Sequence, residues 1–146
     1  MMDLVVRAPR LPVIGESLLS HSFRTSPGGK GGNQAIAAAR LGASVTMIGQ
    51  VGADRFGEIL RERLEAEGVD TRFVSVDPEL GTGVAVPIVL DSGENAIFAV
   101  PQANLTLSPL LMERARDVIS SAAMLLVQFE VNMDATLAAM RLAEAA

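Results

Sequence analysis

The order in which strand and helix patterns follow one another constrains the fold of this chain most. An alanine-rich helix is predicted over residues 33–41, where Gly42 stops it, and a buried strand follows over residues 44–51. Asp54 then caps a second helix, which ends at Gly68. Because strands separated by helices form parallel sheets covered by those helices, the pattern predicts an α/β core.

Several strands of a different kind are also predicted. The stretch Asp91-Ser92-Gly93-Glu94 is typical of a hairpin turn, and no helix pattern lies among the strand candidates that surround it. Strands joined by hairpins form antiparallel sheet, so we expect a small accessory sheet beside the α/β core. The further strand candidates occupy residues 4–6, 16–23, 73–76, 83–90 and 95–100.

The last part of the chain returns to the α/β pattern. Ser108 and Pro109 open a helix, residues 124–128 are predicted to form a buried strand, and a final helix begins near Met133. That helix lacks a terminating glycine, basic last turn or proline, and the first strand candidate begins almost at once. We therefore expect both ends to be truncated.

Composition excludes several classes of function. The net charge is −5 without a Lys/Arg cluster, which argues against nucleic acid as a partner. Residues 122–127 form the longest proline-free apolar stretch, too short to cross a bilayer, and no signal peptide is recognisable, so we expect no membrane partner and a cytoplasmic protein. With no cysteine and only His21, no metal site is predicted. His21 itself is interpreted as solvated or hydrogen-bonded.

A glycine-rich loop is the most informative motif. Glycines flank Lys30 on both sides, so the backbone can approach a ligand closely, and the helix that follows offers its amide-rich end. The loop is not a Walker motif, because Lys30 is followed by glycine instead of serine or threonine, and it is not a dinucleotide fingerprint. Alone, it fits either a flexible linker or a ligand-binding loop.

Three segments in register, residues 28–35, 39–43 and 48–57, together resemble the ribokinase family of pfkB-type carbohydrate kinases. Further matches in family order extend the resemblance over essentially the whole chain, as the N-terminal portion of such a kinase. The chain departs from the family at Gln102, where glycine is usual, and at Gly32, where alanine is commoner. The further matches are residues 3–16, 64–71, 82–85, 93–95 and 128–130.

The resemblance implies a ribokinase-like three-layer α/β/α core, incomplete here, with a small β-sheet lid. Residues 1–146 would form the N-terminal part of one kinase domain. We expect lid strands at about residues 3–25 and 83–100 and the core at about residues 28–76 and 108–146, with the C-terminal ATP-binding half absent.

The same resemblance implies a sugar site. Asp3 would hold two vicinal ribose hydroxyls, because a carboxylate is purely an acceptor. Gly29 and Lys30 would line the sugar with their backbone, Asn33 would use its amide, and Glu130 would contact a hydroxyl from a strand end. Without the resemblance, Asp3 reads as a turn acid, Asn33 as a helix cap and Glu130 as a solvated residue.

The activity implied is ATP-dependent phosphorylation of D-ribose to ribose 5-phosphate, with ATP and Mg²⁺ as cofactors; activation by a monovalent cation is left open. The family places its catalytic base in a Gly-Ala-Gly-Asp stretch of the C-terminal half, which this sequence lacks. No catalytic residue is therefore assigned, and we expect the chain alone to be inactive.

Other interpretations stay open. The chain is either a fragment that carries the function by descent, one half of a split sugar or nucleoside kinase, or a non-catalytic sugar-binding or dimerisation module. Deoxyribose or another sugar would also suit the loop. We expect a homo-oligomer formed through the lid sheet or through exposed edges of the core.

Overall fold

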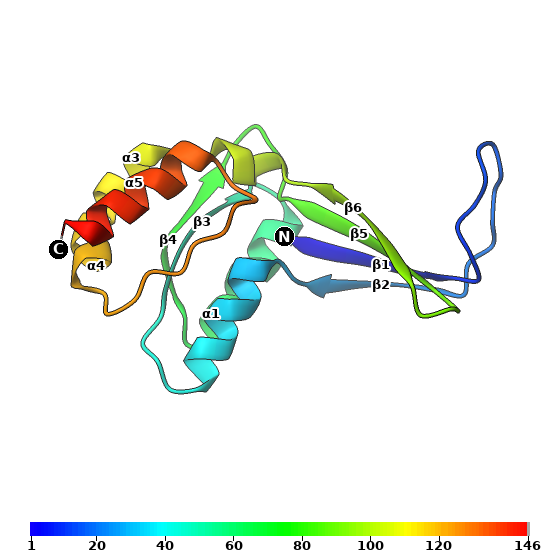
Figure 1. The fold of residues 1–146 in the computed structure, drawn as a ribbon, viewed down its shortest axis with the longest axis horizontal. Helices are drawn as coiled ribbons and strands as arrows, with labels where there is room; N and C mark the ends of the chain where they lie inside the picture. Colours follow the sequence, from blue (N-terminus) through cyan, green and yellow to red (C-terminus); the bar gives the residue numbers. More distant parts are fainter. Residues whose placement is uncertain (146) are drawn as a thin grey trace.

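The computed structural model describes residues 1–145. Figure 1 shows an elongated molecule, with the helices gathered at one end and a four-stranded sheet extending from them to a loop at the other. The strands are β1 (Met2–Ala8), β2 (Ser22–Pro27), β3 (Thr46–Gly52), β4 (Asp70–Asp77), β5 (Val84–Leu90) and β6 (Asn95–Val100). The helices are α1 (Lys30–Arg40), α2 (Arg55–Ala66), α3 (Pro109–Arg114), α4 (Arg116–Ser121) and α5 (Met133–Glu144), with a short 3-10 helix, η1 (Gln102–Thr106).

The sequence signals for helix ends are mostly confirmed. The Asp54 side chain caps α2 by accepting a hydrogen bond from the backbone N–H of Gly57 at 2.8 Å. Ser108 caps α3 in the same way, through the N–H of Leu110. The predicted start of the first helix is wrong by three residues: α1 begins at Lys30, and the N–H of Asn33 already donates to the carbonyl of Gly29. The glycines after Lys30 therefore lie within the helix, although glycine disfavours helix.

The strands form two separate sheets. The larger has the order β2-β1-β5-β6, with antiparallel outer pairs and a parallel central pair, β1 with β5. The hairpin predicted at residues 91–94 joins β5 to β6. The smaller sheet pairs β3 with β4 in parallel. The accessory sheet is therefore confirmed, but it is mixed, because β1 and β5 are joined by a long crossover.

The α/β/α layering expected from the sequence is present around β3 and β4. Ile48 and Phe73 pack against the hydrophobic cluster that includes residues of α3, α4 and α5. Met47 packs on the opposite face against the clusters that include residues of α1 and α2. Helices thus cover both faces of the parallel pair, as parallel strands require.

A buried hydroxyl connects the two sheets. Thr82, which precedes β5, is only 2% exposed. Its hydroxyl accepts a hydrogen bond from the N–H of Gly52 at 2.9 Å and donates one to the Asp54 carboxylate at 2.6 Å. The Gln102 side chain donates a hydrogen bond to the carbonyl of Thr82 at 3.1 Å. The backbone of Gln102 has a left-handed φ of 46°. These hydrogen bonds therefore join the segment after β3 to the segments before β5 and after β6.

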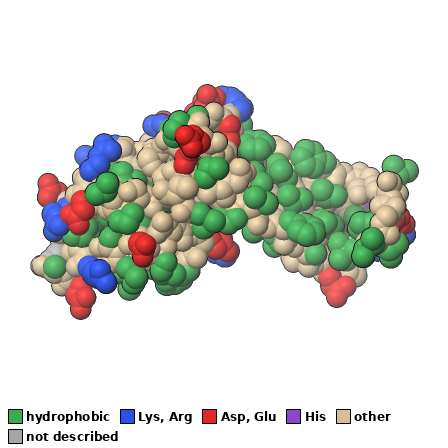
Figure 2. Space-filling view, turned by 90° about the horizontal axis from the view of Figure 1, so that it is seen from above, with side chains coloured by type: hydrophobic (Ala, Val, Ile, Leu, Met, Phe, Trp, Pro, Cys, Tyr) green, Lys and Arg blue, Asp and Glu red, His purple; other side chains and the backbone are tan. Residues whose placement is uncertain are grey.

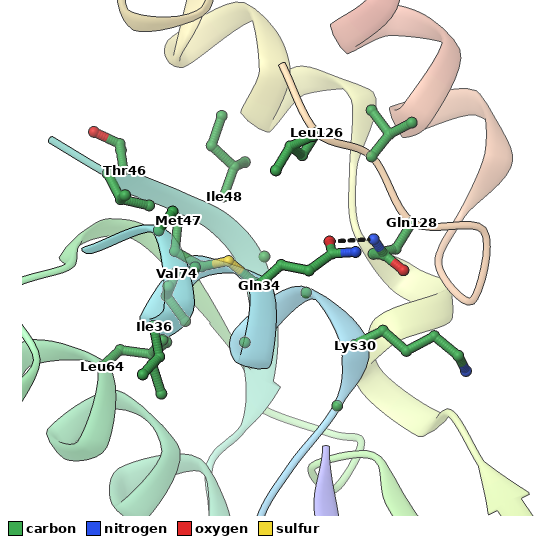
Figure 3. Close-up of a pocket in the computed structure, with 18 of the residues that line it drawn as sticks. Lys30, Gln34, Ile36, Thr46, Met47, Ile48, Leu64, Val74, Leu126 and Gln128 are labelled. Carbon is green, nitrogen blue, oxygen red and sulfur yellow. Dashed lines mark hydrogen bonds between the residues drawn. The ribbon is translucent and has the colours of Figure 1, made fainter. Parts of the chain in front are cut away.

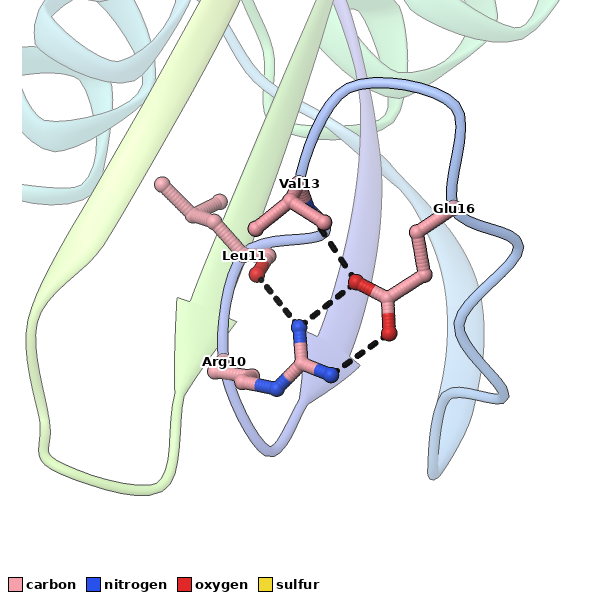
Figure 4. A network of polar contacts seen from close by, with 4 residues as sticks. All are labelled: Arg10, Leu11, Val13 and Glu16. Carbon is pink, nitrogen blue, oxygen red and sulfur yellow. Dashed lines mark hydrogen bonds and ion pairs between the residues drawn. The ribbon is translucent and has the colours of Figure 1, made fainter.

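The strand predicted over residues 16–23 is wrong, since β2 begins only at Ser22. Figure 4 shows the cause: Glu16 accepts two hydrogen bonds from the Arg10 guanidinium, at 2.5 and 2.7 Å, and one from the N–H of Val13 at 3.0 Å. The Arg10 hydrogen bond, assisted by Val13, lowers the pKa of Glu16 to about 2. These contacts close a loop, and the apolar Leu19 that suggested a strand is 93% exposed.

The buried strand predicted over residues 124–128 is also wrong. The segment is extended, but within residues 1–145 it pairs with no strand. Leu125 packs on the helical cluster, whereas Met124 and Leu126 are 75% and 61% exposed. An apolar run gives a buried strand only where a neighbouring strand supplies hydrogen bonds, and none lies beside it here. In the part of the chain that is described, no helix is long and apolar enough to cross a membrane.

Candidate functional site

The first component of the site is the contact between Asp3 and the glycine loop. Asp3 lies on β1 opposite Ser26 of β2, two residues before Gly28. A Cβ atom added to Gly28 would collide with the Asp3 carboxylate, so that carboxylate lies directly against the Gly28 backbone. Only glycine leaves room for the Asp3 carboxylate to lie this close to the backbone, and the contact places the negative charge of Asp3 near the start of α1.

Gly29 turns the chain into α1. It holds a φ of 85°, in the left-handed region that favours glycine, and occupies the N-cap of the helix. The first-turn N–H groups that follow have no partner inside the helix, so they are available to a ligand. Asn33 lies one turn further along with an exposed side chain. The helix end therefore offers hydrogen-bond donors near the Asp3 carboxylate, and the Asn33 amide lies one turn further along.

Glu130 reaches the loop through an ion pair with Lys30. The two side chains are 48% and 65% exposed, and they connect the start of α1 to the segment before α5. The sequence predicts a role only for the Lys30 backbone, so this contact of its side chain is an additional feature. Residues a hundred positions apart carry no local signal of such a pairing.

The Met1 amino group marks the point where these residues converge. It lies close to Gly29, where an added Cβ would be 2.9 Å from the Met1 nitrogen. Burial lowers the pKa of this amino group, and the Asp3 and Glu130 carboxylates act in the opposite direction. Both carboxylates are therefore close to one point. The structure brings together Asp3, Gly29, Lys30 and Glu130, with Asn33 one turn away.

The chemistry of this arrangement suits a neutral, hydroxyl-rich molecule. Carboxylates accept hydrogen bonds from hydroxyls, while backbone N–H groups and an amide donate them. The carboxylates of Asp3 and Glu130 would repel the phosphates of a free nucleotide, so this site suits a neutral sugar better. Among residues 1–145, no three His, Cys, Asp or Glu side chains are grouped to hold a metal ion.

Two features of the site were missed by sequence analysis. Gly28 is buried and touches Asp3, but in the sequence it is one glycine among several. Gln34 of α1 accepts a hydrogen bond from the amide of Gln128 at 2.6 Å, as Figure 3 shows. This bond spans a groove of about 1420 Å³ that begins at the glycine loop and runs between β3 and residues 121–128.

Comparisons with known proteins identify the family of this chain. The chain matches the family described as pfkB family carbohydrate kinase over residues 1–146. It is 44% identical over 130 residues to a ribokinase from Bacillus subtilis, a match that covers 89% of this chain and 44% of the relative. It is 35% identical to a deoxyribokinase from Salmonella typhi, covering 92% of this chain and 44% of the relative.

A solved structure gives the same result for the fold. The ribokinase of Arabidopsis thaliana, complexed with ribose and ATP, superposes with a TM-score of 0.86 at 27% identity, covering 99% of this chain and 47% of that one. The chain thus spans less than half the length of the relatives it matches. Since the family match extends over all its residues, this chain belongs to the pfkB family of carbohydrate kinases.

Proposed function

We propose that this chain forms the sugar-binding part of a ribokinase-type kinase, which transfers phosphate from ATP to D-ribose and yields ribose 5-phosphate. The observation that carries the proposal is the convergence of Asp3, Gly29, Lys30 and Glu130 at the start of α1. The ribokinase relatives, one of them complexed with ribose and ATP, support ribose as the sugar.

Each side chain has a role that follows from its chemistry. Asp3 accepts hydrogen bonds from two vicinal hydroxyls of the sugar, while the backbone at Gly29 and Lys30 lines the ring. Asn33 donates and accepts through its amide. Glu130 accepts from a further hydroxyl and is oriented by its ion pair with Lys30. Together these groups hold the acceptor sugar and fix which hydroxyl points toward the phosphate donor.

The four-stranded sheet serves as the lid over the sugar, in this proposal, with lid strands at about residues 3–25 and 83–100. The core comprises about residues 28–76 and 108–146. Figure 2 shows hydrophobic side chains gathered over the half of the molecule that contains this sheet. Ile97 and Phe98 of β6 are 56% and 66% exposed, which supports self-association through this surface.

The nucleotide and its Mg²⁺ would be held by residues outside this chain, and the chain alone would not transfer phosphate. Its partner would be the remaining half of the kinase fold, which lies either in the same protein or, in a split kinase, in a second chain. A sugar-binding module without catalysis is the alternative. Similarity to a deoxyribokinase makes 2-deoxyribose the competing sugar.

Isothermal titration calorimetry with ribose and with 2-deoxyribose tests the proposal. Because Asp3 holds two hydroxyls, ribose should bind about tenfold more tightly than 2-deoxyribose, which lacks one of them. Asp3→Asn, which removes the charge but keeps the shape, should weaken ribose binding by about tenfold to a hundredfold. Asp117→Asn, on an exposed position of α4, is the matched control and should leave binding unchanged.

The outcomes separate the alternatives. Equal binding of both sugars, or ribose binding unaffected by Asp3→Asn, would refute the assigned role of Asp3. ATP consumption that appears only when a C-terminal half from a relative is added supports the split kinase. Ribose binding without any restored activity would favour the non-catalytic module.

A further inference from the structure

Two side chains of α1 contact the same distant segment of the chain. Lys30 and Gln34 lie one helical turn apart, and residues four apart on a helix share a face. The Lys30 ammonium pairs with the Glu130 carboxylate, and the Gln34 side chain accepts a hydrogen bond from the Gln128 amide at 2.6 Å. Figure 3 shows this hydrogen bond next to the Lys30 side chain. The start of α1 therefore holds residues 128–130 at two points.

The half-buried Gln128 is anchored to two helices. A Cβ atom added to Gly31 would lie 3.5 Å from Cγ of Gln128, an ordinary van der Waals distance, so the stem of this side chain lies over the first turn of α1. The end of the side chain then reaches Gln34. The backbone carbonyl of Gln128 accepts a hydrogen bond from the Thr136 hydroxyl of α5 at 3.5 Å. Both its side chain and its backbone are therefore held.

Asn132 anchors the segment on the other side of Glu130. Its backbone N–H donates to the carbonyl of Asn104 at 3.2 Å, and its side chain caps α5 by accepting a hydrogen bond from the N–H of Asp134 at 2.8 Å. Residues 129 and 130, between the two anchors, form a bend. The backbone of Glu130 thus lies two residues from an anchor in either direction, and these anchors set its place.

The ion pair with Lys30 cannot position Glu130 alone. Lys30 contacts Oε1 of the carboxylate, which leaves Oε2 to accept a hydrogen bond from another donor. The two side chains are 65% and 48% exposed, and an ion pair between exposed side chains holds its geometry only weakly. The direction in which Oε2 points therefore depends on contacts that fix the backbone beside Glu130.

We propose that Gln128 and Gln34 are positioning residues, whose hydrogen bond seats the backbone before Glu130 on α1 and so directs the free oxygen of Glu130 toward the sugar. This inference rests on the proposed role of Glu130 in binding ribose. Because α1 also carries Asn33, the same hydrogen bond fixes the spacing between the Asn33 amide and the Glu130 carboxylate. Neither glutamine contacts the sugar in this proposal.

Methionine substitutions test the hydrogen bond, because methionine matches the length of glutamine but forms no comparable hydrogen bond. Isothermal titration calorimetry should show ribose binding weakened by about threefold to tenfold in Gln128→Met. Gln34→Met should weaken it by the same factor, and the double variant no further, since all three lose one and the same bond. Arg114→Met, at an exposed position of α3, is the matched control and should change binding by less than about twofold.

A double-mutant cycle with Glu130→Ala separates positioning from general support of the fold. If Gln128 acts through Glu130, Gln128→Met should change ribose binding by less than about twofold once residue 130 is alanine. If Gln128→Met weakens binding by the same factor with glutamate or alanine at position 130, Gln128 does not act through Glu130, and the proposal is overturned.

A second measurement needs no sugar, so it separates this inference from the proposed function. Order parameters from NMR relaxation report the fast motion of the backbone amides of residues 129–131. They should fall in Gln128→Met and Gln34→Met and keep their values in Arg114→Met. Unchanged order parameters in both glutamine variants would overturn the proposal. If they fall while Glu130→Ala leaves ribose binding intact, Gln128 does hold Glu130 in place, and the proposed sugar contact of Glu130 is what fails.

Discussion

Replacing Thr82 with valine should destabilise the fold by about 3 kcal/mol, because valine keeps the volume of threonine but forms no hydrogen bond. The buried Thr82 hydroxyl serves two partners, the N–H of Gly52 and the carboxylate of Asp54. A buried amide left without a partner costs about 1–3 kcal/mol, and a hydrogen bond to a carboxylate contributes about 1.5–3 kcal/mol. Asp54 keeps its backbone hydrogen bonds from Gly57 and Thr82, so the lower part of each range applies.

Urea denaturation followed by circular dichroism at neutral pH measures this difference. Thr82→Ser is the matched control, because it keeps the hydroxyl and loses one methyl group, which costs about 1 kcal/mol. A valine variant within about 0.5 kcal/mol of the unmodified chain, or a serine variant as unstable as the valine variant, would contradict this role of the Thr82 hydroxyl.

The same variant changes the response to acid. Burial raises the pKa of Asp54, but hydrogen bonds from Thr82, Gly57 and Phe56 outweigh it and lower the pKa below its ordinary value. A carboxyl whose pKa is lowered by folding adds stability above its ordinary pKa, and this contribution is lost as the pH falls toward the folded value. Thr82→Val removes one cause of the lowering, so its stability should fall less steeply with acid.

Three further predictions concern single positions. Gly28→Ala places a Cβ where the Asp3 carboxylate lies, so calorimetry should show ribose binding weakened by about tenfold or more; unchanged binding would separate this contact from the site. Gln102→Ala keeps the strained left-handed backbone and loses a side-chain hydrogen bond, so urea denaturation should show about 1 kcal/mol of destabilisation, whereas Gln102→Gly removes that strain and should be nearly neutral. The hydrogen bond from the Thr106 hydroxyl, with backbone N–H groups, lowers the pKa of Asp77 to about 2. Its stabilising contribution is complete above about pH 4 and lost as the pH falls to about 2, so unfolding measured across this range should depend less on pH in Asp77→Asn; equal slopes would contradict this.

Features set by neighbouring residues could be read from the sequence. Asp54 and Ser108 predict where their helices begin, because a capping side chain accepts its hydrogen bond from the first turn of the same helix. The turn at residues 91–94 is equally local, and it joins β5 to β6 as predicted. The candidate site residues Asp3 and Asn33 were predicted through the family pattern, since neither has a distinctive local signal.

Features that depend on distant partners could not be read in this way. Leu19 has the composition of a strand, but the Arg10–Glu16 contacts close a loop beside it and leave it exposed. The apolar residues 124–128 lack a neighbouring strand among the described residues. They therefore form no strand pairing, and Met124 and Leu126 stay exposed. The Lys30–Glu130 ion pair and the contact of Gly28 with Asp3 exist only once the chain has folded.

The parallel pairing of β1 with β5 determines when the molecule can be completed during its synthesis. Met2 lies opposite Val84, so the centre of the larger sheet joins two segments that are synthesised well apart in time. At about 5–20 residues per second, β5 leaves the ribosome roughly 4–16 s after β1. Until then β1 has only β2 beside it, with its other edge exposed to chaperones and to other nascent chains. Pairings of such long sequence separation are slow to form, so the Asp3 side of the candidate site matures near the end of folding.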